Sequence, residues 1–504
     1  MSAGEAVASP KATAADRLVI LITVSLCTML YALTMTIVNV ALPQLQGALS
    51  ATPDQVSWVV TLNVVATAVV TPMTGWLVAR FGQRQVLIWS VAGFSLFSLL
   101  CATANTLPPL LIYRIGQGAL GAPLVPLAQA IIVANYPPAQ RAMAQGVFGM
   151  SVVIGPAIAP MLGGYLAEEY GWRWIFLLIL PLCAVALLGV FAFIRDGGRQ
   201  AGTRLDWTGF ILLSLAVSAL QFVMDRGQRL DWFESDLIIL LAIVIGLAFY
   251  MFVVHTATAD KPFISPALFL DQNFSVGLFL VFVYGMLNLT PLVLLPPLLH
   301  DLMGFPDSLI GILLGTRGAG MVLGFFAASR MGRLDPRVGI VLGLGLIGYS
   351  GWRMAGFDFN IPAFEVGWIG VIQGFGCGLM WVPLSLVTFA TLPERLLPDA
   401  SAIFHLLRNF GSSIFISLSV LAVVRSGSVA YAEITETVSP FNEAFAFASL
   451  RGLWSIESTR GLGALAGEIG RQATLIGYTN AFLMYALVCV AALPLMLFIS
   501  IRQR

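Results

Sequence analysis

Long apolar runs recur along the whole chain and are separated by short polar segments. Fourteen runs are long enough to cross a bilayer, which requires roughly 20 apolar residues. They lie near 17–41, 54–76, 86–104, 107–133, 142–166, 174–194, 207–224, 236–255, 273–298, 308–328, 338–355, 364–390, 400–424 and 476–501. None alternates between apolar and polar residues as barrel strands do. The pattern therefore predicts an all-α integral membrane protein with fourteen transmembrane helices.

The composition is that of a chain that meets lipid rather than water. Of 504 residues, 58% are hydrophobic and 10% are charged, whereas a typical soluble domain carries about 25% charged residues. So few polar side chains cannot cover a water-facing surface. The net charge of +1 offers no basic patch for nucleic acid. A soluble enzyme, a disordered protein and a nucleic-acid-binding protein are excluded.

Lysine and arginine indicate which loops are cytoplasmic, because short cytoplasmic loops carry an excess of both residues. The side that holds the two termini has fifteen of them in its tails and short loops, and the opposite short loops have four. With an even number of spans, this bias places both termini in the cytoplasm. Residues 1–16 are then an N-terminal tail without a cleavable signal. The longer segment 425–475 is expected as an outer loop.

Short sequences recur in the two parts of the chain at a constant spacing. Three pairs are 256 residues apart: Gln117 with Gln373, Pro137 with Pro393, and Gly155 with Gly411. Duplicated halves around a site at the bilayer midplane are the construction of secondary transporters. We expect six-helix halves at 17–194 and 273–504, with two extra helices in a linker over 195–272. The alternative is that the repeats reflect bundle packing alone.

Three arginines lie in the interior of predicted spans, away from the span ends: Arg114, Arg317 and Arg408, with His405 one turn before the last. A charge at the bilayer centre costs roughly 2.5–3.5 kcal/mol, so these side chains are expected to face a central cavity. No Asp or Glu lies in the middle of a predicted span, which makes the cavity positive. Amphipathic anions or neutral compounds are favoured over lipophilic cations. Alternatively, the arginines cap backbone carbonyls of kinked helices.

Proton coupling requires a group that titrates. His405 is the one near-neutral group in the interior of a predicted span, and Asp206 and Asp225 flank the 207–224 span. These three residues are the candidates. The alternative for His405 is a neutral, hydrogen-bonded helix residue.

Other kinds of chemistry have no sequence signal. The five cysteines are scattered through apolar runs, and the three histidines lack ligand spacing, so neither a metal nor another cofactor is expected. No phosphate-binding loop is present, so ATP is not the expected energy source. No cluster of catalytic groups indicates an enzyme, and no ring of like charges indicates a channel.

Four motifs resemble those of the major facilitator superfamily, specifically its fourteen-helix drug:proton antiporter branch, the EmrB/QacA type. They are Thr36-Ile-Val-Asn39-Val-Ala-Leu-Pro43, Gly75-Trp-Leu-Val-Ala-Arg80-Phe-Gly82-Gln-Arg84, Arg114-Ile-Gly-Gln117-Gly118, and Gly155-Pro156-Ala-Ile-Ala-Pro160-Met-Leu-Gly163-Gly164. The run Arg408-Asn409-Phe-Gly411 also fits the branch. The resemblance covers nearly the whole chain, and the fifth-helix motif is its most specific part.

This resemblance implies a proton-driven exporter of the bacterial inner membrane that works by alternating access. The implied gating residues are Gly75, Arg80, Gly82 and Arg84, and the alternative is that these arginines only anchor the loop. The implied antiporter seal consists of Gly155, Pro156, Pro160, Gly163 and Gly164, and the alternative is a packing notch. Together with the charge argument, the substrate-binding candidates are Arg114, Arg408, Arg317, Asn39 and Gln117.

The expected partners are a small-molecule substrate, protons and the lipid bilayer, without nucleic acid. In a Gram-negative cell the resemblance also favours a periplasmic membrane-fusion adaptor, for which the aromatic residues of 425–475 are a candidate docking face. The alternative function is export of one specific metabolite, such as a fatty acid or a siderophore. The sequence departs from the branch at Thr34 and Ala79, where the branch usually has acids. The first departure puts the usual proton-coupling scheme in doubt, and the second weakens the cytoplasmic latch.

Overall fold

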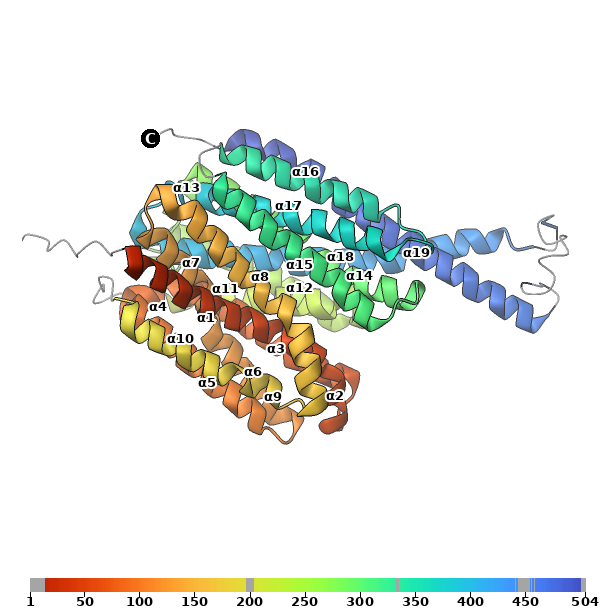
Figure 1. Cartoon of the computed structure of the whole chain (residues 1–504), viewed down its shortest axis with the longest axis horizontal. Coiled ribbons are helices and arrows are strands. Elements are labelled where there is room, and N and C mark those ends of the chain that lie inside the picture. Colours follow the sequence, from red (N-terminus) through yellow and green to blue (C-terminus); the bar gives the residue numbers. More distant parts are fainter. Residues whose placement is uncertain are drawn as a thin grey trace, which may run out of the picture. The chain divides into compact units, whose positions relative to one another are not determined.

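The computed structural model describes residues 14–195, 204–331, 335–439, 441–442, 454, 456 and 458–499. Regular structure in these residues is helical throughout (Figure 1). The fourteen predicted runs coincide with helices or pairs of consecutive helices, to within one residue at their ends except in the last run, 476–501, of which α19 covers residues 476–492. The helices are α1 (Ala14–Val40), α3 and α4 (Pro53–Val70, Thr74–Phe81), α5 (Gln83–Thr103), α6 and α7 (Leu107–Gly121, Leu124–Asn135), α8 (Pro138–Glu169), α9 and α10 (Trp174–Leu177, Ile179–Phe193), α11 (Trp207–Arg226), α12 (Asp236–Thr258), α14 (Gln272–Pro297), α15 (Asp307–Arg330), α16 (Pro336–Met354), α17 (Ala363–Phe389), α18 (Leu397–Glu436) and α19 (Thr459–Ala492).

The all-helical membrane fold is confirmed. Within the described ranges, thirteen helical segments are long and apolar enough to cross a membrane. The remaining predicted span, 338–355, is α16, a helix of 19 residues. It is less apolar because it is rich in glycine and carries Arg337 and Arg353 near its ends. The short helices α2 (Leu42–Ala48) and α13 (Ala267–Leu270) complete the α-helical elements of these ranges.

Local sequence explains where several helices begin. The Thr52 side chain accepts a hydrogen bond from the Gln55 backbone N–H, and the Gln55 side chain accepts one from the Thr52 N–H. This reciprocal pair satisfies two donors that a helix start leaves free. Proline occupies the first turn of α3 and α8, where its missing N–H is not needed.

The chain divides into two compact units. The N-terminal unit comprises Met1–Trp207 and Leu392–Ile403, and the C-terminal unit comprises Thr208–Thr391 and Phe404–Arg504. The division falls inside α18, whose first turns belong to the N-terminal unit. Helices α11 and α12, the two predicted extra helices, belong to the C-terminal unit apart from Trp207.

Glycines allow close helix contacts in the N-terminal unit, where α1 packs on α8 and α3 packs on α6. A Cβ atom on Gly118 of α6 would overlap the carbonyl oxygen of Asn63 on α3. A Cβ atom on Gly155 of α8 would lie 2.8 Å from the carbonyl oxygen of Met29 on α1. Small residues at such crossings let backbones approach closely, which drives helix association in lipid.

The C-terminal unit has the same two kinds of contact at positions shifted by 256 residues. A Cβ atom on Gly374 of α17 would overlap the carbonyl oxygen of Arg317 on α15. One on Gly411 of α18 would overlap the carbonyl oxygen of Phe282 on α14. The spacing that relates the sequences therefore also relates the helix crossings inside each unit.

The segment expected as an outer loop over 425–475 is largely helical. Helix α18 continues to Glu436 and α19 starts at Thr459, where the Ser458 side chain caps the helix by accepting from the Gly461 N–H at 3.0 Å. The two helices pack on each other, since a Cβ atom on Gly427 would lie 3.4 Å from the Ala473 carbonyl oxygen. In Figure 1 they run past the ends of α14 to α17.

This difference has a physical reason. A hydropathy pattern detects the part of a helix that faces lipid. It does not detect a polar continuation of the same helix into water. The 40 residues of α18 span about 60 Å at 1.5 Å per residue, whereas the hydrocarbon core of a bilayer is about 30 Å thick. The two helices are therefore long enough to extend beyond a membrane.

Candidate functional site

Arg114 lies at the centre of a buried hydrogen-bond network in the N-terminal unit, and its side chain is fully buried. Its Nε donates to the Val59 carbonyl oxygen at 2.9 Å, and its Nη1 donates to Gln117 Oε1 at 2.5 Å. Gln117 Nε2 in turn donates to Ser98 Oγ at 2.7 Å, and Asn63 Nδ2 donates to the Arg114 carbonyl oxygen at 2.8 Å. The network joins α3, α5 and α6 and leaves Arg114 Nη2 buried without a hydrogen bond in the described residues.

Arg317 has a similar network in the C-terminal unit. Its Nε donates to Gln373 Oε1 at 2.5 Å, and its Nη2 donates to the carbonyl oxygen of Asn288 and, at 2.7 Å, to Asn288 Oδ1. Gln373 Nε2 donates to the Tyr485 hydroxyl at 2.9 Å, and that hydroxyl donates to the Leu287 carbonyl oxygen at 2.8 Å. Each unit therefore pairs a buried arginine with the glutamine of the 256-residue repeat.

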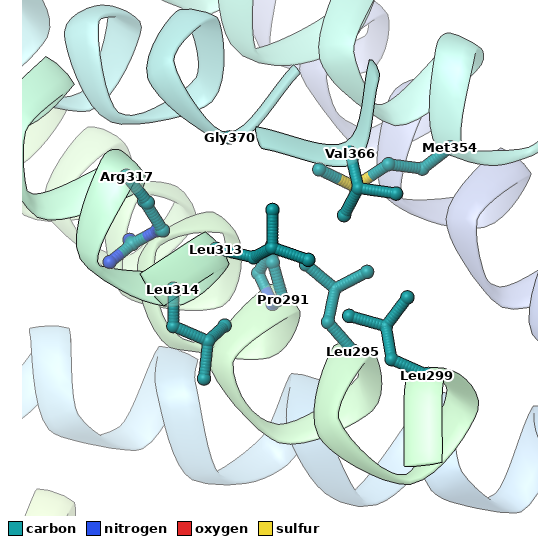
Figure 2. Close-up of a pocket in the computed structure, with 9 residues that line it drawn as sticks. All are labelled: Pro291, Leu295, Leu299, Leu313, Leu314, Arg317, Met354, Val366 and Gly370. Atoms are coloured by element: carbon teal, nitrogen blue, oxygen red, sulfur yellow. The ribbon is translucent and has the colours of Figure 1, made fainter. Parts of the chain in front are cut away.

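Arg317 also borders a small apolar pocket (Figure 2). The pocket is lined otherwise by Pro291, Leu295, Leu299, Leu313, Leu314, Met354, Val366 and Gly370. Figure 2 shows the Arg317 guanidinium at the edge of the pocket, on the side away from Leu299 and Met354. The free volume of ≈ 10 Å³ is about the least that holds one water molecule. This pocket is therefore too small for an amphipathic substrate in the conformation described.

Arg408 differs from the other two arginines because its side chain is partly exposed. Its Nη2 donates to Asn409 Oδ1 at 3.1 Å, and its guanidinium carbon lies 5.8 Å from the ring centroid of Trp381. His405, one turn earlier on α18, is 2% exposed, and its ring centroid lies 6.1 Å from that of Trp381. The sequence analysis did not single out Trp381, although it stands immediately before the Val-Pro-Leu repeat on α17.

The two acidic candidates for proton coupling lie far from each other. Asp206 and Asp225 are at opposite ends of α11, a helix of 20 residues, and are thus about 30 Å apart. Asp225 is exposed and lies 3.8 Å from Arg226 Nε. His405, the third candidate, is buried on α18. The two aspartates are therefore too distant to share one proton.

Asn39 of the first-helix motif and Thr34, which precedes the motif, are not part of the arginine networks. Asn39 is exposed at the end of α1. Thr34, which stands where the branch usually has an acid, is fully buried and donates its hydroxyl hydrogen bond to the Leu30 carbonyl oxygen at 2.8 Å. Thr34 therefore fills its position as a helix-bonded polar residue and supplies no titratable group.

The loop motif between α4 and α5 is built around two buried glycines. Gly82 ends α4 with φ of 87°, a conformation that glycine adopts without strain. Arg84 Nη2 donates to the Phe191 carbonyl oxygen at 2.7 Å, at the end of α10, where a cation also complements the helix dipole. Arg80 is exposed.

The structure adds Asp399 to this motif. A Cβ atom on Gly75 would overlap Oδ1 of Asp399, which lies in the first turn of α18 and is half-buried. Ser401, two residues later, donates to Gln129 Oε1 at 3.2 Å. The start of α18 is thus held within the N-terminal unit. The sequence analysis missed Asp399, because it lies 324 residues from Gly75 and no local pattern connects the two positions.

The fifth-helix motif presents its glycines unequally to α1. A Cβ atom on Gly163 would lie 2.7 Å from Ile37 Cγ1, whereas one on Gly164 would have nothing within 4 Å. Gly155 contacts α1 as described above, and Pro156 is half-buried. The side chain of Pro160 lies outside the described residues. These contacts are a packing notch within the N-terminal unit, and the seal between halves stays a prediction.

Comparison with known proteins connects these features to a family. The model of the Major Facilitator Superfamily matches residues 24–416. The multidrug export protein EmrB of Escherichia coli K12 is 31% identical over 494 residues, which cover 96% of this chain and 95% of EmrB. The fatty acid resistance protein FarB of Neisseria gonorrhoeae is 29% identical over 471 residues, 91% of each chain. Among solved structures, the human organic anion transporter MFSD10 is similar in fold, with a TM-score of 0.61, 16% identity, and coverage of 94% of this chain and 99% of that one.

Proposed function

The chain belongs to the Major Facilitator Superfamily, in the branch of EmrB-type multidrug exporters, and on this premise we propose that it exports amphipathic compounds in exchange for protons. The observation that carries the proposal is the relationship to EmrB along nearly the whole of both chains. It is a multi-pass membrane transporter. Proton exchange, the class of substrate and the partner are the parts that we propose.

Alternating access between two half-transporters is the proposed mechanism. Support comes from the recurrence of the glycine crossings at Gly118 and Gly374, and at Gly155 and Gly411, within the two units. Each unit is internally braced by a buried arginine–glutamine pair. Units of this kind can move as rigid bodies around a fixed site, which is how secondary transporters alternate.

Anionic or neutral hydrophobic compounds are the proposed substrates. Arg114 and Arg317 donate to carbonyl and amide oxygens, so their positive charge is not neutralised by these hydrogen bonds. Arg408 is the principal proposed contact because its side chain is partly exposed. Arg114 offers its remaining donor, Nη2. Arg317, Gln117 and Asn39 are secondary candidates.

His405 is the principal candidate for the proton site, with Asp206 and Asp225 as alternatives. It is buried on α18 one turn from Arg408, so its protonation state and the occupancy of an anion site at Arg408 would be linked electrostatically. Asp225 is exposed beside Arg226, away from such a buried site.

The proposed location is the bacterial inner membrane, with both termini in the cytoplasm. The excess of Lys and Arg in the loops on that side supports this orientation. The extensions of α18 and α19 would then project outside, where they offer a helical surface to a periplasmic membrane-fusion adaptor. Val429 and Leu462 are 52% and 45% exposed on these extensions, as apolar contacts for a partner would be.

The alternative is an exporter of one metabolite, for which a fatty acid is the specific candidate. FarB, named for fatty acid resistance, supports this alternative. The positive charge of Arg408 would suit the head group of such a compound as well as that of an anionic drug. A siderophore has no comparable support.

The test is transport by everted membrane vesicles that contain the protein, with an imposed pH gradient. We expect uptake of anionic and neutral dyes that stops when a protonophore collapses the gradient. Vesicles without the protein are the control. Uptake that is independent of the gradient would refute proton exchange, and export of cations alone would refute the substrate class. Uptake restricted to decanoate would favour the fatty acid alternative.

A further inference from the structure

A compact group of aromatic side chains surrounds Trp381 in the C-terminal unit. The ring centroid of Trp381 lies 5.0 Å from that of Tyr284, 5.5 Å from that of Phe404 and 6.1 Å from that of His405. The rings meet at angles of 47°, 62° and 43°, within the tilted and edge-on range that aromatic pairs favour. We call these four residues the Trp381 cluster. They come from α14, α17 and α18.

The cluster contains a donor that lacks an acceptor. Trp381 is 2% exposed, and its Nε1–H has no hydrogen-bond partner in the described residues. Buried polar groups in native structures are nearly always paired, and tryptophan in particular finds a partner for its N–H when it is buried. This N–H is therefore free to donate to an acceptor that a ligand brings.

A cation lies beside this donor. The guanidinium of Arg408 is 5.8 Å from the Trp381 ring centroid, within the range of a cation–π interaction. The helices that build the cluster contain four carboxylates, all near helix ends: Glu365, Asp399, Glu433 and Glu436. Asp399 is the nearest along the chain, nine residues from Arg408 and thus about 13 Å away on the helix. The cluster therefore combines a positive group, an unpaired N–H and aromatic faces.

We propose that the Trp381 cluster and Arg408 form a binding site for planar aromatic carboxylates. The ligand carboxylate accepts hydrogen bonds from the Arg408 guanidinium, which matches its geometry, and from Trp381 Nε1–H. The ligand ring packs against the aromatic side chains. Because Trp381 is closed off in this conformation, the side chains around it must move apart for the ligand to enter. The inference rests on the proposed transport function and names a substrate class for it.

Equilibrium binding to the purified full-length protein in detergent tests the site without any gradient. The probes are 2-naphthoate, decanoate as an aliphatic carboxylate, and 2-naphthylmethyltrimethylammonium as an aromatic cation. Isothermal titration calorimetry should show 2-naphthoate binding at least threefold more tightly than decanoate, because ring contacts add to charge pairing. It should bind at least tenfold more tightly than the cation. Decanoate binding that equals or exceeds 2-naphthoate binding would overturn the proposal.

Variants separate the two roles of the indole. Trp381→Phe keeps a ring but removes the N–H, and should weaken 2-naphthoate binding about tenfold, the typical effect of a hydrogen bond to a charged group. Trp381→Leu should weaken 2-naphthoate more than decanoate. Trp352→Phe, at an exposed tryptophan of α16 in the same unit, is the matched control and should bind like the wild type. If Trp381→Leu does not remain monodisperse, Trp381→Phe carries the test alone.

Unchanged 2-naphthoate affinity in Trp381→Phe would overturn the proposal, as would equal losses of both carboxylates in Trp381→Leu. A wrong assignment of the transport function would give a different result. In that case 2-naphthoate binds as expected, but everted vesicles show no gradient-driven uptake. Gradient-driven dye uptake without 2-naphthoate binding would refute the site and leave the transport function standing.

Discussion

The close approach of Gly75 and Asp399 gives the sharpest test of the cytoplasmic loop motif. A methyl group added by Gly75→Ala would overlap Asp399 Oδ1 and would lie 3.0 Å from the backbone α-carbon of Asp399. Extra volume in a packed region costs about 1–3 kcal/mol. If the conformation with α18 held against α4 is part of the transport cycle, its population should fall about 5- to 150-fold. We expect the initial transport rate of Gly75→Ala in proteoliposomes to fall at least fivefold.

A double-mutant cycle distinguishes this local crowding from general damage. Asp399→Ala removes the overlapping carboxylate, so the Gly75→Ala/Asp399→Ala variant should recover most of the lost rate. Recovery should be incomplete because the added methyl group still lies 3.0 Å from the backbone at position 399. Gly47→Ala is the matched control, since a Cβ atom there has nothing within 4 Å. Wild-type rates in Gly75→Ala, or a double variant no faster than Gly75→Ala, would refute the reasoning.

Three further predictions concern packing, the buried network and the helical extension. Gly163→Ala should lower the midpoint of thermal unfolding, because the added methyl group crowds Ile37. The neighbouring variant Gly164→Ala should leave the midpoint unchanged or raise it slightly, since nothing lies near a Cβ atom there. Equal effects of the two variants would contradict the packing of this motif against α1. Arg114→Met should destabilise the protein by about 1–3 kcal/mol, since it leaves a buried Gln117 oxygen unpaired, and an unchanged midpoint would argue against the network. Deleting 429–465, which removes Val429 and Leu462, and joining the helices with a short glycine–serine linker should preserve folding and dye transport in vesicles. It should reduce resistance in cells if the extension binds an adaptor, and unchanged resistance would refute that role.

The sequence predicted the helices well because apolar length is the dominant signal in a bilayer. Thirteen of the fourteen runs lie in helices to within one residue at their ends, and the last run does so over residues 476–498. The same signal missed the continuation of α18 over 425–436 and of α19 over 459–475, which have no apolar run. The length of an apolar run reflects the thickness of the hydrocarbon layer that a helix crosses. It does not indicate how far the helix continues in water.

The partners of the candidate side chains were harder to predict. The Arg114–Gln117 bond joins residues three apart on one helix, which is a spacing that places side chains on the same face. The Arg317–Gln373 bond joins residues 56 apart, and the approach of Gly75 to Asp399 joins residues farther still. Nothing in local spacing indicates such pairs, because they depend on which helices pack together and in what register.

The comparison of the two networks bears on where substrate selectivity resides. The 256-residue spacing relates Gln117 to Gln373 but relates Arg114 to Gly370, and in the C-terminal unit the guanidinium comes from Arg317 on the neighbouring helix. The guanidinium that binds the equivalent glutamine thus comes from the same helix in one unit and from a neighbouring helix in the other. This arrangement is expected of hydrogen bonds that stabilise helix packing. Bracing engages two of the three guanidinium nitrogens of Arg114, Nε and Nη1, and two of those of Arg317, Nε and Nη2. Discrimination between anions and cations then depends on Arg408. The Arg408→Gln variant should bind 2-naphthoate more weakly, while its affinity for neutral 2-naphthylmethanol should stay within about twofold of the wild type. Equal losses of affinity for the two ligands would instead assign Arg408 a purely structural role.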